Sequence, residues 1–299
     1  MFTAGYISQQ ALNGVVLGSM YALLALGMTV IYGILRLINF AHGALITLGA
    51  FCFYLCLTLL GLPFIAAIGL VIGFGALMGL VLDAAAYKKI RGGPEVSLLI
   101  TSLGFYIFIE NLMKLIVSPQ PYAFRPPVFL SQLNKVGTVT FRTVDIFIIL
   151  SSLAIMALFT AFVKRTKLGI AMRATAESIE TARLVGINVD RVIAIAFILG
   201  SAIASITGFM WGAKYGQISY DMGFMAGVKA FVAIVVGGVG SIPGAMLGGF
   251  ILGIVETLSI GFLPPGFAAY RDGIVFAILI LVLLLRPSGI MGRKKEVHV

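Results

Sequence analysis

Residues 14–43 read GVVLGSMYALLALGMTVIYGILRLINFAHG, and this stretch decides the fold. Arg36 is the first Asp, Glu, Lys or Arg of the chain, so the apolar run before it is long enough to cross a bilayer as a helix, which takes roughly 20 residues. The run ends in a polar group of Arg36, Asn39 and His42. Backbone freed at such a junction must be covered by protein or face water, because lipid offers no hydrogen-bond partner. The junction is therefore a candidate for structure that lines a membrane path.

The composition places the whole chain in the membrane. Of the 299 residues, 60% are hydrophobic and 11% are charged, and the mean hydropathy is +1.10. A soluble domain carries about 25% charged residues, so a globular enzyme is excluded. Polar segments do not exceed about 30 residues, well short of a typical soluble domain. We expect one all-α transmembrane domain over residues 1–299, a polytopic helical bundle with broken helices.

Apolar runs and the turn residues between them predict about nine spans, within a range of 8–10. The seventh span is short and can be re-entrant, since it breaks at GGVGSIPG, residues 237–244. The expected spans cover residues 10–35, 42–60, 64–86, 96–117, 144–163, 192–213, 222–238, 244–262 and 270–286.

Basic residues predict the orientation. Of the 21 Lys and Arg residues, 13 fall in three clusters between spans, and such clusters mark cytoplasmic loops. Placing all three inside leaves the amino terminus outside and the carboxyl terminus in the cytoplasm. The clusters are Lys88, Lys89 and Arg91; Lys164, Arg165, Lys167, Arg173, Arg183 and Arg191; and Arg286, Arg293, Lys294 and Lys295.

Four ionisable residues stand out within the expected spans, where such groups are costly and usually paired or functional. Lys229 and Glu256 fall at matching depths of the seventh and eighth spans, so we predict that they form an intramembrane ion pair. Glu110 and Lys114 are four residues apart on one helix and are expected to pair with each other. A proton relay is the alternative, but it needs more acids or histidines than the spans contain. Cys52 and Cys56 have no nearby His or acid, so no metal site is expected.

The basic segment at about 166–190 is expected to form a cytoplasmic helix over 168–187. Its alanines favour a helix, Gly186 stops it, and Asn188 suits the following turn. The residues alone leave two interpretations open: a surface that docks into another protein, or an interfacial helix with a solvated charged face.

Three stretches resemble the branched-chain amino acid permease family of bacterial ABC importers, most closely its smaller, H-type subunit. They are residues 14–43, residues 173–194 (RATAESIETARLVGINVDRVIA) and residues 223–256 (GFMAGVKAFVAIVVGGVGSIPGAMLGGFILGIVE). The resemblance implies a multi-pass permease of the bacterial inner membrane that imports branched-chain or related amino acids. It also implies a second, related permease subunit, two ATPase subunits that carry ATP and Mg, and a periplasmic binding protein.

By the same resemblance, residues 173–188 are the segment that couples to the ATPases. The fully developed EAA signature of other importer classes is not spelled out in this segment. The coupling residues that the resemblance assigns are Arg173, Ala174, Glu177, Ala182, Arg183, Gly186 and Asn188.

One position departs from the family pattern. Members commonly carry Glu directly after Phe-Ala-His-Gly, whereas this chain has Ala44. The missing acid makes an amide, urea or an aromatic acid an alternative substrate class.

Broken helices are the best sequence pointers to a transport path. Two breaks occur, at Asn39–Gly43 and Gly237–Gly244, and we expect both to face the subunit interface. For His42 a helix-end cap is the competing role. The expected path residues are Asn39, His42, Gly43, Gly237, Gly238, Gly240 and Ser241.

The external loop at about 118–143 is a candidate dock for the binding protein, or a connection lying on the bundle.

Two other function classes fit the sequence poorly. A secondary transporter working without ATP would need intramembrane coupling acids that this chain scarcely has. An enzyme finds no support, because no Ser-His-Asp signature is recognisable and the glycine-rich turn at 237–241 lacks the Lys of a phosphate-binding loop.

Overall fold

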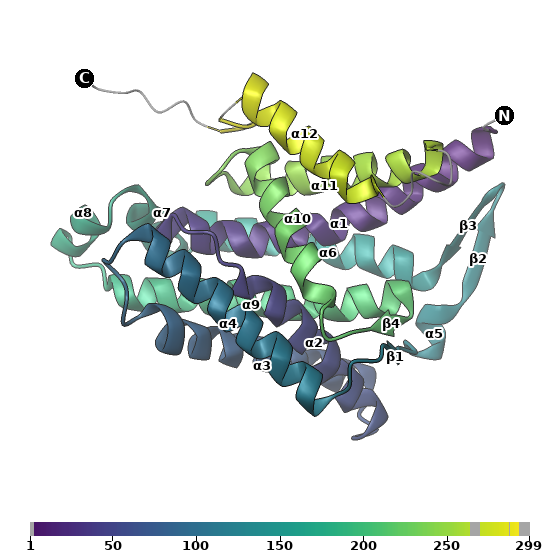
Figure 1. The fold of residues 1–299 in the computed structure, drawn as a ribbon, viewed down its shortest axis with the longest axis horizontal. Helices are drawn as coiled ribbons and strands as arrows, with labels where there is room; N and C mark the ends of the chain where they lie inside the picture. Colours follow the sequence, from purple (N-terminus) through teal and green to yellow (C-terminus); the bar gives the residue numbers. More distant parts are fainter. Residues whose placement is uncertain (1–2, 264–269, 287, 293–299) are drawn as a thin grey trace.

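The computed structural model describes residues 3–263, 270–286 and 288–292, and these residues are mainly helical (Figure 1). Seven of the described helices are long and apolar enough to cross a membrane, and α10 and α12 are shorter apolar helices. The predicted polytopic helical bundle is thus confirmed. Residues 264–266, between the expected spans 244–262 and 270–286, and the basic residues 293–295 lie outside the described residues. The apolar helices are α1 (Ala4–Leu35), α2 (Ala41–Thr58), α3 (Phe64–Leu82), α4 (Glu95–Ile116), α6 (Thr143–Arg165), α9 (Val189–Tyr215), α10 (Met222–Gly237), α11 (Ile242–Phe262) and α12 (Arg271–Leu285).

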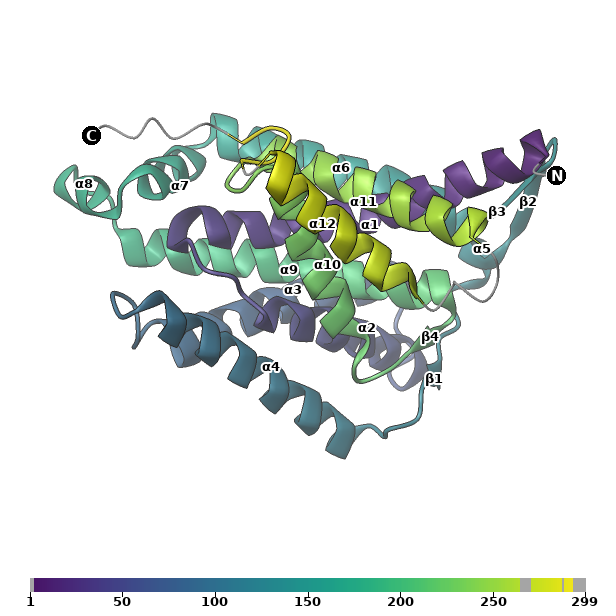
Figure 2. The ribbon, with the colours of Figure 1, turned by 45° about the horizontal axis from the view of Figure 1, so that its top comes forward.

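Helix α1 is the centre of the bundle. Nearly its whole apolar length is buried, and it contacts α6, α9, α10 and α11. Helix α9 is the second central helix and packs on α2 and α3. Figure 2 shows α4 at one edge of the bundle, with α6 and α11 toward the opposite edge and α12 across the front. The stretch that decides the fold is therefore also the stretch that most other helices pack against.

Glycines set the close approach of α1 and α11. A Cβ atom at Gly253 would overlap the backbone of Gly18, and one at Gly249 would overlap the backbone of Ala22. Small residues at such spacing let helix backbones meet in lipid, where packing rather than the hydrophobic effect holds helices together. Gly240 plays another role, because it faces open space and has a φ of 79° in the turn between α10 and α11.

One end of the bundle carries the small β structures. Strands β1 (Tyr122–Ala123) and β4 (Gln217–Ile218) pair antiparallel, and β2 (Leu133–Val136) forms a hairpin with β3 (Val139–Arg142). Short helix α5 (Val128–Ser131) lies between the two sheets in sequence. The first turns of α1 lie beside the hairpin, since Gln9 Nε2 donates to the Thr140 carbonyl at 2.9 Å.

The opposite end carries α7 (Lys167–Glu177) and α8 (Ile179–Leu184), as both views show (Figures 1 and 2). The expected single helix over 168–187 is wrong, because the chain is extended at Ser178, with φ −153° and ψ 118°. Ser178 then caps the second helix, its Oγ accepting from the Thr181 amide at 3.2 Å. Serine favours such an N-cap over a helix interior, so the segment forms two short helices.

Candidate transport and coupling sites

The first helix junction is a true break. Helix α1 ends at Leu35, and Arg36 adopts a left-handed conformation with φ 53°, its amide donating to the Tyr32 carbonyl at 2.7 Å. The next four residues are not helical, and α2 begins at Ala41.

This connection turns back into the bundle. A Cβ atom at Gly27 would lie 3.0 Å from His42 Cε1, so the start of α2 packs beside Gly27. Gly27 precedes the end of α1 at Leu35 by eight residues, or about 12 Å of helix. Figure 2 shows the connection running back from the end of α1 to the start of α2. The start of α2 therefore lies deeper in the bundle than the end of α1.

Polar contacts hold the connection in place. Tyr87, in the single π-helical turn η1 (Asp83–Tyr87), donates its hydroxyl to Asn39 Oδ1 at 2.8 Å. Ser102 of α4 accepts from the Phe40 amide at 3.4 Å, and its hydroxyl proton is shared between the Leu99 carbonyl at 2.7 Å and the Ile38 carbonyl at 3.3 Å. Two other helices thus satisfy backbone and side-chain groups that lipid would leave unpaired.

The expected path residues at this break do not face outward. Asn39 and His42 are both 0% exposed within the single chain, which corrects the expectation that they face a subunit interface. Within the described residues neither imidazole nitrogen of His42 makes a hydrogen bond of normal geometry, although the Leu24 backbone lies close. The imidazole therefore does not cap α2. Gly43 allows a close approach, because a Cβ there would meet the Gly223 carbonyl oxygen at the start of α10.

The second break is a tight turn closed by the segment that follows α12. Gly237 packs on Gly244, and Ser241 caps α11 by accepting from the Gly244 amide at 3.1 Å. The carbonyls of Val236 and Gly237 accept from the amides of Ile290 and Met291, at 2.9 and 2.8 Å. Of the expected path residues here, Gly237 and Gly238 are buried, Gly240 is exposed and Ser241 is partly exposed.

The structure brings the predicted intramembrane pair together. Lys229 Nζ lies 2.6 Å from Glu256 Oε1. Sequence reasoning missed two other members of the cluster. Asp272 Oδ1 lies 2.8 Å from the same Nζ, and the Tyr21 hydroxyl donates to Glu256 Oε2 at 2.8 Å. Asp272, an acid in the first turn of the last apolar helix, was the signal that could have found the second carboxylate.

The predicted pairing of Glu110 with Lys114 is wrong. The ion pairs of the described residues do not include these two side chains. Lys114 Nζ instead lies over the ring of Tyr220, 5.7 Å from its centroid. An ion pair four residues apart on one helix contributes only about 0.2–0.5 kcal/mol, and an aromatic ring offers the lysine a competing partner.

The predicted coupling residues fall on the exposed α7–α8 pair and its exit. Ala182 differs from the others: it is buried and packs α8 inward, so it offers no contact surface. Ala174 is partly buried. The tip after α8 carries two apolar side chains that sequence reasoning did not single out, Leu184 and Val185, which are 87% and 69% exposed. The exposed members are Arg173, Glu177, Arg183, Gly186 and Asn188, and the Asn188 side chain caps α9.

Arg91 ties two connections at this end together. Its guanidinium pairs with Asp83 of η1 and, through Nη1, with Asp190 Oδ1 at 2.8 Å. Asp190 lies in the first turn of α9, directly after the coupling segment. Arg91, expected only as one charge of a basic cluster, therefore links the α3–α4 connection to the exit of that segment.

Aromatic contacts anchor the loop at 118–143. Phe124 is buried against Phe53 and Phe209, and Phe129 packs edge-on against Phe64. The β2–β3 hairpin remains exposed, with Val136 69% exposed. The loop is thus fastened to the bundle at one side and presents a hairpin at the other.

A multi-pass helical bundle with a deep helix break and an exposed helical pair between two spans defines a membrane transport protein. The family described as branched-chain amino acid transport system / permease component matches residues 10–283. The chain belongs to this family, so it is a transport permease subunit and not an enzyme.

Individual relatives agree with that assignment. The chain is 41% identical to the high-affinity branched-chain amino acid transport system permease protein LivH of Escherichia coli K12, over 96% of each chain. It is 38% identical to the corresponding protein BraD of Pseudomonas aeruginosa, over 95% of each. It is also 24% identical to the permease protein LivM of Salmonella typhimurium, over 95% of this chain and 71% of that protein.

Proposed function

We propose that this chain carries branched-chain amino acids across the bacterial inner membrane as one permease subunit of an ATP-driven importer. The similarity to LivH over nearly the full length of both chains carries this proposal, since that relative is named for branched-chain amino acid transport. The related amide, urea or aromatic-acid substrates remain the second candidate because of Ala44. Ala44 is buried in the first turn of α2, so the break lacks the carboxylate that an acid there would bring.

The partners follow from the same proposal. The similarity to LivM supports a second, related permease subunit beside this one. Two ATPase subunits bind the end that carries α7 and α8 and hold the ATP and Mg. A periplasmic binding protein docks at the β2–β3 end. The amino terminus then lies outside, and the basic residues Lys88, Lys89 and Arg173 lie at the cytoplasmic end, as basic loops require.

The α7–α8 tip is the proposed contact with the ATPases. Exposed apolar side chains such as Leu184 and Val185 are costly in water and mark surfaces that a partner covers. Movement of this tip is carried into the bundle through α9, which starts at Val189, and through the Arg91–Asp190 pair.

Uptake by the assembled complex tests the function. The chain would be co-expressed with a second permease subunit and the ATPase subunits, purified, and reconstituted in vesicles with the binding protein. We expect ATP-dependent leucine uptake that disappears when the ATPases are omitted. Uptake by this chain alone, driven by an ion gradient, would overturn the proposal. A panel of leucine, an amide, urea and an aromatic acid separates the two substrate candidates.

A matched pair of variants tests the docking surface. Val185→Asp and Val136→Asp change the same residue type, at 69% exposure, at opposite ends of the bundle. We expect Val185→Asp to reduce the ATPase that co-purifies with the permease, and Val136→Asp to leave it unchanged. Equal ATPase recovery with both variants would remove the tip from the interface.

A further inference from the structure

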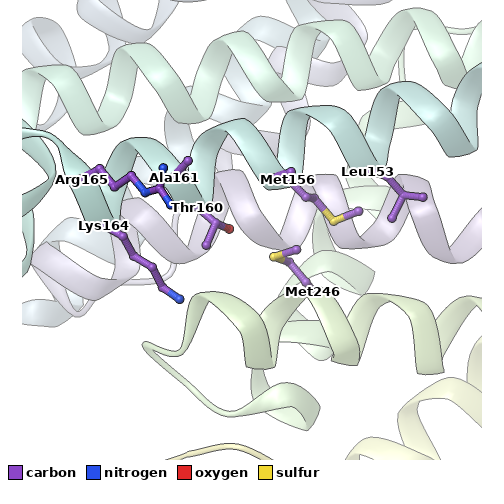
Figure 3. Close-up of a pocket in the computed structure, with 8 residues that line it drawn as sticks. Leu153, Met156, Thr160, Ala161, Lys164, Arg165 and Met246 are labelled. Carbon is purple, nitrogen blue, oxygen red and sulfur yellow. The ribbon is translucent and has the colours of Figure 1, made fainter.

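A groove between α6 and α11 is not used by any function described above. It has a volume of about 510 Å³ and is lined by Leu153, Met156, Ala157, Thr160, Ala161, Lys164 and Arg165 of α6 and by Met246 of α11. Both helices pack on α1, whose ribbon passes behind the groove (Figure 3). Met156 and Met246 approach each other across it, and Lys164 reaches toward the start of α11.

The lining changes character along the groove. Most of its length is apolar, while both cations stand at the end where α6 finishes, at Arg165. The lining contains no Asp or Glu. Within the described part of the chain, Lys164 and Arg165 are exposed and take part in no ion pair. The groove therefore offers two unneutralised positive charges beside an apolar channel.

The length of the groove matches one leaflet. Leu153 and Lys164 are eleven residues apart on α6, which is about 16 Å along the helix axis. Half of the ~30 Å hydrocarbon layer is about 15 Å. When the cations stand at the headgroup level of the inner leaflet, Leu153 reaches the middle of the bilayer. Two other occupants fit the groove less well. A free amino acid is far shorter than the groove, and a transmembrane helix of a partner protein would not need two cations at one end of it.

We propose that this groove binds an anionic phospholipid of the inner leaflet. Lys164 and Arg165 hold the phosphate of the headgroup, and one acyl chain lies along Met156, Ala157 and Met246. Basic residues beside grooves between transmembrane helices on the cytoplasmic side suit such headgroups. The assignment to the inner leaflet rests on the orientation proposed above.

Lipid retention by the purified permease complex tests the proposal. Native mass spectrometry of the complex, exchanged into mixed phosphatidylglycerol and phosphatidylcholine, measures which lipid stays bound. We expect preferential retention of phosphatidylglycerol. The double variant Lys164→Gln/Arg165→Gln should lower that retention about thirtyfold, since each of the two cations near the membrane surface contributes about 1 kcal/mol.

Two further variants separate a built site from general surface charge. Lys88→Gln/Lys89→Gln removes two exposed cations at the same end of the bundle but outside the groove, and should leave retention unchanged. Ala161→Trp fills the groove without changing charge and should lower retention as strongly as the double variant. Ala161 is exposed, so the larger side chain does not disturb the core.

Equal retention of the two lipids, or no loss of retention with Ala161→Trp, would overturn the proposal. So would a loss of retention with Lys88→Gln/Lys89→Gln as large as that with Lys164→Gln/Arg165→Gln. A photoreactive residue at Ala157 provides a direct check. It should attach to a phospholipid, and attachment to the second permease subunit would identify the groove as a subunit contact instead. ATP-dependent uptake by the same complexes is measured separately, so failure of lipid binding leaves the transport proposal standing.

Discussion

Lys229 and Glu256, 27 residues apart in the chain, meet at 2.6 Å with side chains only 5% and 4% exposed. The pair joins α10 to α11, and Asp272 and Tyr21 extend it to α12 and α1. One buried lysine thus faces two carboxylates at a point where four helices meet. Breaking such a pair leaves an uncompensated charge in the interior, which is why it costs more than the pair contributes.

Glu256→Gln should destabilise the permease by up to about 3 kcal/mol, because only the partly exposed Asp272 then remains to balance Lys229. Asp272→Asn should cost less, because the Asp272 side chain is 31% exposed and Glu256 remains to balance Lys229. Thermal unfolding of the purified complex in detergent measures both. The variant complexes that still assemble should keep the same preference for leucine over other substrates. A change in preference without a change in stability would contradict a structural role.

Gly253→Ala should weaken the contact between α1 and α11. The added methyl group would overlap the Gly18 backbone, and overpacking of this kind costs roughly 1–3 kcal/mol. Gly69→Ala is the matched control, because nothing lies within 4 Å of a Cβ atom there. The control should be neutral or slightly stabilising, since alanine favours a helix over glycine. Equal melting temperatures for the two variants would argue against glycine-mediated packing.

Asp190→Asn should reduce coupling more than stability. Asp190 is well exposed, so its ion pair with Arg91 contributes at most about 1 kcal/mol to folding. Loss of the link should lower leucine moved per ATP hydrolysed by roughly threefold, a coupling change of about 0.6 kcal/mol. The ratio is measured in vesicles. Lys89→Gln, a change of a cation in the α3–α4 connection that has no ion pair among the described residues, should leave the ratio unaltered.

Asn39 and Tyr87 should act as a unit. Removing either partner, by Asn39→Leu or Tyr87→Phe, breaks the hydrogen bond that holds the connection between α1 and α2. Each change should cost about 1–3 kcal/mol where it leaves a buried polar atom unpaired. The double variant should cost less than the sum of the two. Strictly additive losses in thermal unfolding would show that the two side chains do not depend on each other.

Much of the fold could be predicted from local sequence because the lipid environment demands long apolar helices. The ends of most helices follow from turn residues such as Pro63 and Gly216. The pairing of Lys229 with Glu256 followed from matching depths, since a charge inside a span needs a partner.

Contacts between distant parts of the chain could not be predicted from local sequence in the same way. The depth of the break at Asn39 depends on where α2 packs against Gly27, which no local pattern encodes. Ser178 sits in an alanine-rich stretch that favours one helix, yet its side chain caps a second. Arg91 has partners 8 and 99 positions away, so its role as a link appears only in three dimensions.

The hydrogen bonds from Ile290 and Met291 to the end of α10 have a practical consequence. Helix α10 has 16 residues, about 24 Å, and so is shorter than the ~30 Å hydrocarbon layer. The residues after α12 act as its lid, shielding two carbonyls that would otherwise meet acyl chains. Shortening the protein after Leu285 would therefore uncover a site some fifty positions upstream.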